Sequence, residues 1–173
     1  MSGVDLNKII VLLREYSQKQ KTVTKLIIVG GLALQHYGLK DRHTYDVDAE
    51  VRGNLDRLRT FLKSKGIPSD LGENISNWSV VSIPTGYQKR ASTLYKDRHL
   101  EIKVLDPVDF VISKLRRFTE QDIQDALFVA KTFKIPAKTV MKAKSDVIKC
   151  SPKDTLLFQF GKYVDYFVKK LVK

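Results

Sequence analysis

An apolar run, a glycine pair, a short helix and a second strand follow one another near the start of this chain, and this order most constrains its fold. Residues 25–29 are apolar and largely β-branched, which is typical of a buried strand. Gly30 and Gly31 follow directly, and residues 33–38 predict a short amphipathic helix. Residues 44–51 then alternate, which predicts a second strand with two different faces.

Acidic residues occupy one face of that second strand. Asp46, Asp48 and Glu50 share this face, and the intervening residues share the other. Aspartate is depleted in strands, and like charges on one face repel each other unless a cation lies between them. The pair Asp46 and Asp48 therefore predicts a site for one or two hard divalent cations, Mg²⁺ or Mn²⁺. The alternative is a solvent-facing edge strand, and we interpret Glu50 as solvated or as a support for the metal ligands.

The glycine pair between the first strand and the helix has two interpretations. A tight strand-to-helix turn needs glycine for its backbone conformation alone. Bare backbone N–H groups at the start of a helix also bind phosphate. Because the acid pair follows, we favour a phosphate-binding role for Gly30 and Gly31.

These motifs resemble the signature of the DNA polymerase β-like nucleotidyltransferase superfamily. Its residues here are Gly30-Gly31 and Arg42-x-Thr44-x-Asp46-Val47-Asp48. More narrowly, the chain is similar to the branch containing the abortive-infection type IV toxins and their uncharacterised bacterial relatives. A second stretch fits that branch: Leu105-Asp106-Pro107-x-Asp109, Ser113-Lys114-Leu115, Arg117 and Asp122-x-x-Asp125. The similarity spans roughly residues 25–130.

The resemblance implies further site residues. A centre of this type needs a third carboxylate from a neighbouring strand, and Glu101 is the acid inside a later predicted strand. Its alternative is a surface glutamate paired with lysine. By position, Arg42 and Thr44 belong to the nucleotide-binding site, although both could be ordinary loop residues. Lys114 and Asp122 match residues associated with nucleotide binding, but Asp122 could instead belong to a capping box.

Composition indicates which partners suit the chain. The formal net charge is +12, from 31 basic and 19 acidic residues. A basic surface favours a polyanion such as RNA, and the toxin resemblance implies tRNA and an antitoxin partner. The alternative is that small lysine-rich proteins are often simply basic. The chain has one cysteine, no apolar stretch long enough to cross a membrane and no signal core at its N-terminus. We therefore expect a cytoplasmic protein with no membrane partner.

The predicted fold is α+β: a nucleotidyltransferase-type mixed sheet with flanking helices, followed by a C-terminal helical bundle. A change of pattern at Asp106-Pro107 divides the chain into an α/β domain of residues 1–105 and a helical domain of residues 106–173. We expect Leu157 and Phe160, on the apolar stripe of the last helix, to be buried. Other predicted elements are helices at 5–19 and 55–65, a strand at 79–83, and a hairpin of 91–95 with 100–105.

The sequence is compatible with three functions. The first is a metal-dependent nucleotidyltransferase that moves a nucleoside monophosphate from a nucleoside triphosphate to an acceptor hydroxyl, with RNA as acceptor. The second is a nucleotide-binding or nucleic-acid-binding module that keeps the fold without turnover. The third is a metal-dependent nuclease that uses the same carboxylates.

Overall fold

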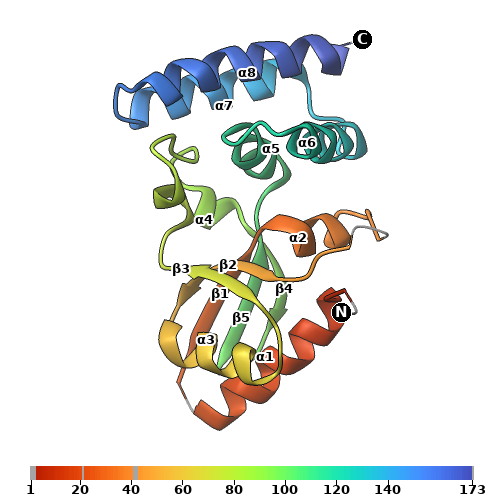
Figure 1. Ribbon diagram of the computed structural model, residues 1–173, viewed down its shortest axis with the longest axis vertical. Coiled ribbons are helices and arrows are strands. Elements are labelled where there is room, and N and C mark those ends of the chain that lie inside the picture. Colours follow the sequence, from red (N-terminus) through yellow and green to blue (C-terminus); the bar gives the residue numbers. More distant parts are fainter. Residues whose placement is uncertain (1–2, 21, 41–42, 173) are drawn as a thin grey trace. The chain divides into compact units, whose positions relative to one another are not determined.

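The computed structural model describes residues 3–20, 22–40 and 43–172, which form two compact units (Figure 1). The first unit combines residues up to 75 with residues 91–105, and the second combines residues 76–90 with residues from 106 onward. From the sequence, residues 76–90 are expected in the first domain. Hydrogen bonds connect them to the helical part instead, because Arg116 donates to the Ser76 carbonyl and the Ser82 N–H donates to Ser151 Oγ.

A five-stranded mixed sheet forms the centre of the first unit, in the order β3-β2-β1-β5-β4. Strand β1 is antiparallel to β2 and parallel to β5, β3 is parallel to β2, and β4 is antiparallel to β5. The mixed sheet and the predicted hairpin are therefore confirmed. The strands are β1 Thr24–Ile28, β2 Val47–Arg52, β3 Ser69–Gly72, β4 Ser92–Lys96 and β5 Leu100–Val104.

Two helices cover the apolar face of this sheet. Helix α1 (Leu6–Gln20) contacts β5, and helix α3 (Leu55–Ser64) contacts β3. The two helices meet where the ring of Tyr16 lies 5.3 Å from that of Phe61. Beneath them the strands bury one apolar set: Leu26, Ile28, Val47, Ala49, Val51, Ile102 and Val104. The opposite face carries Asp48, Glu50 and Glu101, so the predicted alternation is confirmed from Val47 onward, whereas Asp46 precedes the strand.

Helix α2 (Gly30–His36) begins at the glycine pair itself, directly after β1. Its end is fixed by the Tyr37 hydroxyl, which donates a hydrogen bond to the Leu105 carbonyl. Gly38 follows with a positive φ of 106°, a conformation that glycine commonly adopts just past the end of a helix. The strand–glycine–helix–strand order is therefore confirmed.

The predicted strand at 79–83 is wrong. This segment follows a short 3-10 helix, η1 (Ile75–Trp78), and precedes α4 (Tyr87–Arg90). Serine hydroxyls accept its backbone N–H groups, since Val81 donates to Ser79 and Ile83 donates to Ser76. Of the apolar residues that suggested a strand, Val81 and Ile83 are buried in an irregular segment, whereas Val80 is exposed.

Four helices complete the second unit: α5 (Pro107–Leu115), α6 (Glu120–Thr132), α7 (Ala137–Cys150) and α8 (Thr155–Val172). The change of pattern at Asp106-Pro107 and the capping box at Asp122 are confirmed, because the Asp106 carboxylate accepts from the Val108 N–H and Thr119 forms a capping box with Asp122. Leu157 and Phe160 are buried as expected, on the face of α8 that meets the other helices of this unit. In the part of the chain that the structure describes, none of the helices has the length and apolarity needed to cross a membrane.

Candidate active site

Gly30 lies directly against the carboxylate of Asp48. Its φ of +63° is in the left-handed region, which disfavours a side chain. A Cβ built there would lie 2.0 Å from Asp48 Oδ2, far inside van der Waals contact. The two strands are fixed at this point, because the Val29 N–H donates to the Asp48 carbonyl at 3.0 Å. Glycine is therefore required both by the backbone and by the carboxylate beside it.

Gly31 makes the same kind of contact with Thr44. A Cβ on Gly31 would lie 2.5 Å from Thr44 Cβ and 2.6 Å from its Oγ1. The Thr44 hydroxyl in turn donates a hydrogen bond to Asp46 Oδ1 at 2.9 Å. Thr44 is buried, so its hydroxyl holds the Asp46 carboxylate in a defined position. The structure therefore brings the glycine pair, Thr44, Asp46 and Asp48 together, whereas Arg42 lies outside the described residues.

Glu101 is not brought to the acid pair. Lys25 faces Glu101 on β5 and Arg52 on β2, so Glu101 lies in the row of Arg52. Arg52 is four residues beyond Asp48, or about 13 Å along the strand. Glu101 instead forms ion pairs with Lys25 at 3.4 Å and Lys96 at 3.8 Å. Desolvation raises the pKa of its carboxyl, but these lysines more than offset that effect, and the pKa lies below its ordinary value.

Asp70 is the acid that the sheet does place beside the pair, and the sequence reasoning missed it. It is the register partner of Asp48 on the parallel neighbour β3, so both side chains lie on one face. The sequence pattern that would predict this strand is weak, because β3 has four residues and two of them are serine and glycine. Throughout residues 3–20, 22–40 and 43–172, no group of three or more His, Cys, Asp or Glu side chains is arranged to hold a metal ion.

Glu50 is buried, and its interpretation as a solvated residue is wrong. Its side chain is 2% exposed, and its Oε2 accepts a hydrogen bond from the Ile75 N–H at 3.2 Å. The residue lies on the sheet face opposite the apolar set, where the segment that begins at Ile75 is bonded to it. Glu50 therefore supports the segment after β3 and does not extend the acid pair into solvent.

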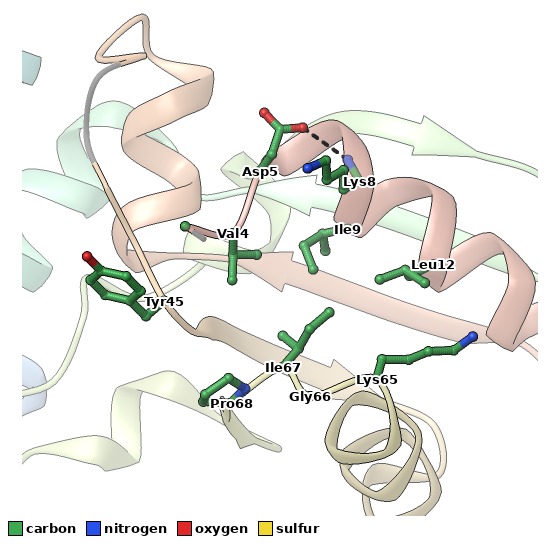
Figure 2. A pocket seen from close by; sticks show the side chains of 11 residues that line it. Val4, Asp5, Lys8, Ile9, Leu12, Tyr45, Lys65, Gly66, Ile67 and Pro68 are labelled. Atoms are coloured by element: carbon green, nitrogen blue, oxygen red, sulfur yellow. Dashed lines mark hydrogen bonds between the residues drawn. The ribbon is translucent and has the colours of Figure 1, made fainter. Parts of the chain in front are cut away.

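A hollow of about 280 Å³ lies nearby but does not contain the acid pair. Figure 2 shows its wall, in which Val4 and Ile9 of the N-terminal segment face Ile67. Tyr45 also lines it, whereas none of the two glycines and the two aspartates does. We therefore do not assign the nucleotide to this hollow.

Lys114 and Asp122 form an internal network in the second unit. Lys114 Nζ donates to Asp125 at 2.8 Å and to Asp122 at 3.2 Å, and all three side chains are buried. Arg117 and Thr119 also donate to Asp122. Burial raises the pKa of Asp122, but these donors and the charge of Lys114 bring it below its ordinary value. The network joins α5 to α6, so direct contact of Lys114 with a nucleotide would require it to leave two carboxylates.

Asp109, another residue of the second motif, has a structural partner as well. Arg90 Nε and Nη2 donate to its two carboxylate oxygens, each at 2.9 Å. The same guanidinium donates to the carbonyls of Pro84 and Thr85. Burial raises the pKa of Asp109, and the ion pair offsets part of that shift. This contact holds residues 84–90 against α5.

A glycine turn packed under an acid pair in a mixed sheet is the arrangement expected of a nucleotidyltransferase. Residues 4–142 match the model of a family described as a nucleotidyltransferase of unknown function (DUF6036). The match covers well over half of the chain, so the chain belongs to this family, which agrees with the superfamily resemblance. No curated protein and no solved structure matches the chain.

Proposed function

We propose that this protein is a Mg²⁺-dependent enzyme that transfers a nucleoside monophosphate from a nucleoside triphosphate to an acceptor hydroxyl. The contact between Gly30 and the Asp48 carboxylate carries this proposal, because no side chain separates the β1–α2 backbone from an acid. The Asp48 carboxylate therefore lies beside the start of α2, where backbone N–H groups favour an anionic phosphate. Family membership supports the nucleotidyl-transfer chemistry.

The residues present fit a magnesium site. Mg²⁺ in nucleotide sites is commonly held by one or two carboxylates, with water and substrate phosphates in the other positions. Asp46 and Asp48 would supply those carboxylates, and Thr44 keeps Asp46 in place. When bound, the cation would neutralise charge on the phosphates and lower the pKa of the acceptor hydroxyl.

In the proposed reaction, the acceptor oxygen forms a bond to the α-phosphorus. The bond from that phosphorus to the oxygen bridging to the β-phosphate breaks, and pyrophosphate leaves. The acceptor hydroxyl loses its proton, which a carboxylate of the acid pair would receive. The protein contributes position and charge, because Gly30, Gly31, Asp46 and Asp48 are fixed relative to one another by the contacts described above.

We propose RNA as the acceptor class, with tRNA as the first candidate to test. The formal charge of +12 supports a polyanionic acceptor. The second candidate function is a non-catalytic nucleotide-binding module. The position of Glu101 favours it, because the third carboxylate expected of an active centre does not join the pair in the sheet.

Incubation with each α-³²P-labelled triphosphate, total RNA and Mg²⁺, followed by a denaturing gel, tests the proposal. We expect label in RNA with one or more triphosphates, and none with Asp48→Asn. Asp56→Asn is the matched control, since the Asp56 side chain is 89% exposed on α3. Nucleotide binding without transfer would indicate the non-catalytic module, and shortening of RNA without triphosphate would indicate a nuclease.

A further inference from the structure

Positive charge is concentrated at the C-terminal end of the chain. Residues 131–173 contain eleven lysines and three acidic residues, which is most of the net charge of the molecule. The described part of this range, residues 131–172, contains the end of α6 together with α7 and α8. Among the described lysines of α7 and α8, Lys144 forms an ion pair with Asp165, and the others form none with acidic side chains. This part of the second unit therefore suits a polyanion.

Helix α8 carries two different faces. Leu157, Phe160, Val164 and Phe167 are buried on the inner face. The outer face carries an alternating stripe of aromatic and basic side chains spaced four residues apart, which places them in one row. We call it the aromatic–lysine stripe, and it consists of Phe158, Lys162, Tyr166 and Lys170.

The rings of the aromatic–lysine stripe are open to solvent and lie next to charges. Phe158 is 66% exposed and Tyr166 is 47% exposed. Lys162 Nζ lies 4.5 Å from the centre of the Phe158 ring, and Lys170 Nζ lies 5.0 Å from that of Tyr166. Single exposed apolar residues are ordinary on protein surfaces. Here an exposed ring with a lysine one turn further along the helix occurs twice. Basic side chains combined with exposed rings are features of surfaces that bind single-stranded nucleic acid, through phosphate contacts and stacking.

Packing holds one ring of the stripe in place before any ligand binds. Phe118 stacks on Tyr163 with ring centres 3.9 Å apart, and Tyr166 meets Phe118 edge-on at 5.8 Å. Phe118 itself has a left-handed backbone, with φ of 56°. Tyr166 is therefore pre-positioned, which reduces the entropy lost when a base stacks on it.

A groove of about 400 Å³ between α7 and α8 adjoins the other ring of the stripe. Leu157 and Phe158 give it an apolar surface. Its charged lining consists of Lys144, Lys153 and Lys162 together with Asp154 and Asp165, so lysines are in excess. The stripe itself runs for about 18 Å along the helix, which is the length of about five stacked nucleotides.

We propose that the outer face of α8 binds single-stranded RNA, with Phe158 and Tyr166 as stacking platforms and the neighbouring lysines on phosphates. This stripe lies beyond residue 142, outside the part of the chain that the family model matches. That the bound RNA is the acceptor rests on the proposed transferase function. The binding itself can be measured without turnover.

Fluorescence anisotropy of the full chain with a 5′-labelled, mixed-sequence 12-nucleotide RNA, without triphosphate or Mg²⁺, tests the proposal. We expect Phe158→Ala to weaken binding about tenfold and the double variant Phe158→Ala/Tyr166→Ala to weaken it further, with the salt dependence unchanged. Lys162→Ala/Lys170→Ala should lower the slope of log affinity against log salt by about two. The matched control is Leu156→Ala, an exposed apolar residue of the same helix, which should bind as the wild type does.

Asp48→Asn separates this inference from the proposed function, because it should bind the RNA normally and yet fail to transfer label. Equal RNA affinity for the wild type and the double aromatic variant would overturn the inference. A competition with polyglutamate provides a second test. If polyglutamate displaces the RNA and has the same affinity for the aromatic variants as for the wild type, the inference is overturned, and the outer face of α8 would be assigned to an acidic protein partner.

Discussion

At the scale of single residues, the two glycines are the positions where fold and chemistry depend on the same atoms. A side chain at Gly30 would overlap with the Asp48 carboxylate. A side chain at Gly31 would overlap with Thr44, whose hydroxyl bonds to Asp46. Asp48 and Asp46 can therefore lie beside the β1–α2 backbone only while both positions remain glycine. A glycine needed only for the turn would show left-handed backbone with open space above it, as Gly66 does.

Gly30→Ala and Gly66→Ala separate backbone strain from displacement of the carboxylate. Both glycines have similar positive φ, +63° and +70°, so each alanine should cost about 1–2 kcal/mol of folding free energy from strain. Only Gly30→Ala should also abolish the thermal stabilisation by Mg²⁺ and triphosphate. Denaturant unfolding gives the first quantity and thermal shift the second. Loss of the ligand response in both variants, or in neither, would contradict this assignment.

Asp122→Asn should destabilise the second unit by about 3–5 kcal/mol at pH 7, because it leaves Lys114 buried with one carboxylate fewer. The native pKa of Asp122 lies below its ordinary value of 3.8. Its ionised form therefore stabilises the fold above that pH, and this contribution is lost as the pH falls through the native pKa.

Urea unfolding at pH 7 and pH 3 should show the difference between wild type and Asp122→Asn shrinking at the lower pH. The exposed control Asp56→Asn should change stability by less than about 0.5 kcal/mol at both. A difference for Asp122→Asn that does not depend on pH would show that the lost interaction is not ionic.

At the scale of elements, the strand register decides which acids can act together. Asp70 on β3 lies beside Asp48, whereas Glu101 on β5 lies in the row of Arg52. Asp70→Asn should weaken Mg²⁺-dependent nucleotide binding roughly fivefold, since it removes a negative charge worth about 1 kcal/mol to a nearby cation. Glu101→Gln should leave that binding unchanged. Isothermal titration with a non-hydrolysable triphosphate measures both, and the reverse order of effects would restore Glu101 as the third acid.

Helix α8 offers a similar comparison between its two faces. Phe160→Ala should cost about 3–5 kcal/mol, because Phe160 is buried against the other helices of its unit. Phe158→Ala should change stability by less than about 0.5 kcal/mol, because the ring faces solvent. Unfolding in urea, followed by far-UV circular dichroism, compares the two. Comparable losses would mean that Phe158 packs against protein and is not open to a ligand.

Patterns of neighbouring residues predicted most helices and strands correctly, but they did not predict hydrogen bonds to residues far along the chain. The caps at Asp5, Asp106 and Thr119 follow from neighbouring residues, and the structure confirms each. The strand at 79–83 was wrong because its backbone donors bond to serine hydroxyls, including Ser151 far along the chain. Such partners are not visible in a local pattern.

The sequence predicted the part of the candidate site whose residues are close together along the chain. Gly30, Gly31, Thr44, Asp46 and Asp48 belong to one strand–helix–strand unit, and they meet as expected. The third acid depends on which strands pair and in which register, and this is set by packing across the whole sheet. Glu101 was chosen for lying in a strand, whereas Asp70 lies in one too short to recognise.

At the scale of the whole molecule, the two units carry different properties. The first holds the acid pair and the glycines, and the second holds the Lys114 network and the aromatic–lysine stripe. We therefore propose that nucleotide chemistry belongs to the first unit and RNA binding to the second. Variants in one unit should leave the property of the other intact.

We propose that Asp46 and Asp48 form a metal–nucleotide site beside the glycine pair, and direct detection of the metal tests this proposal. Electron paramagnetic resonance of free Mn²⁺ can follow its uptake by the full chain in the presence of a non-hydrolysable triphosphate. We predict stoichiometric uptake by the wild type and by Asp56→Asn, and at least tenfold weaker uptake by Asp46→Asn and Asp48→Asn. Uptake by both acid-pair variants that equals the wild type would contradict the claim, because the metal would then be bound elsewhere.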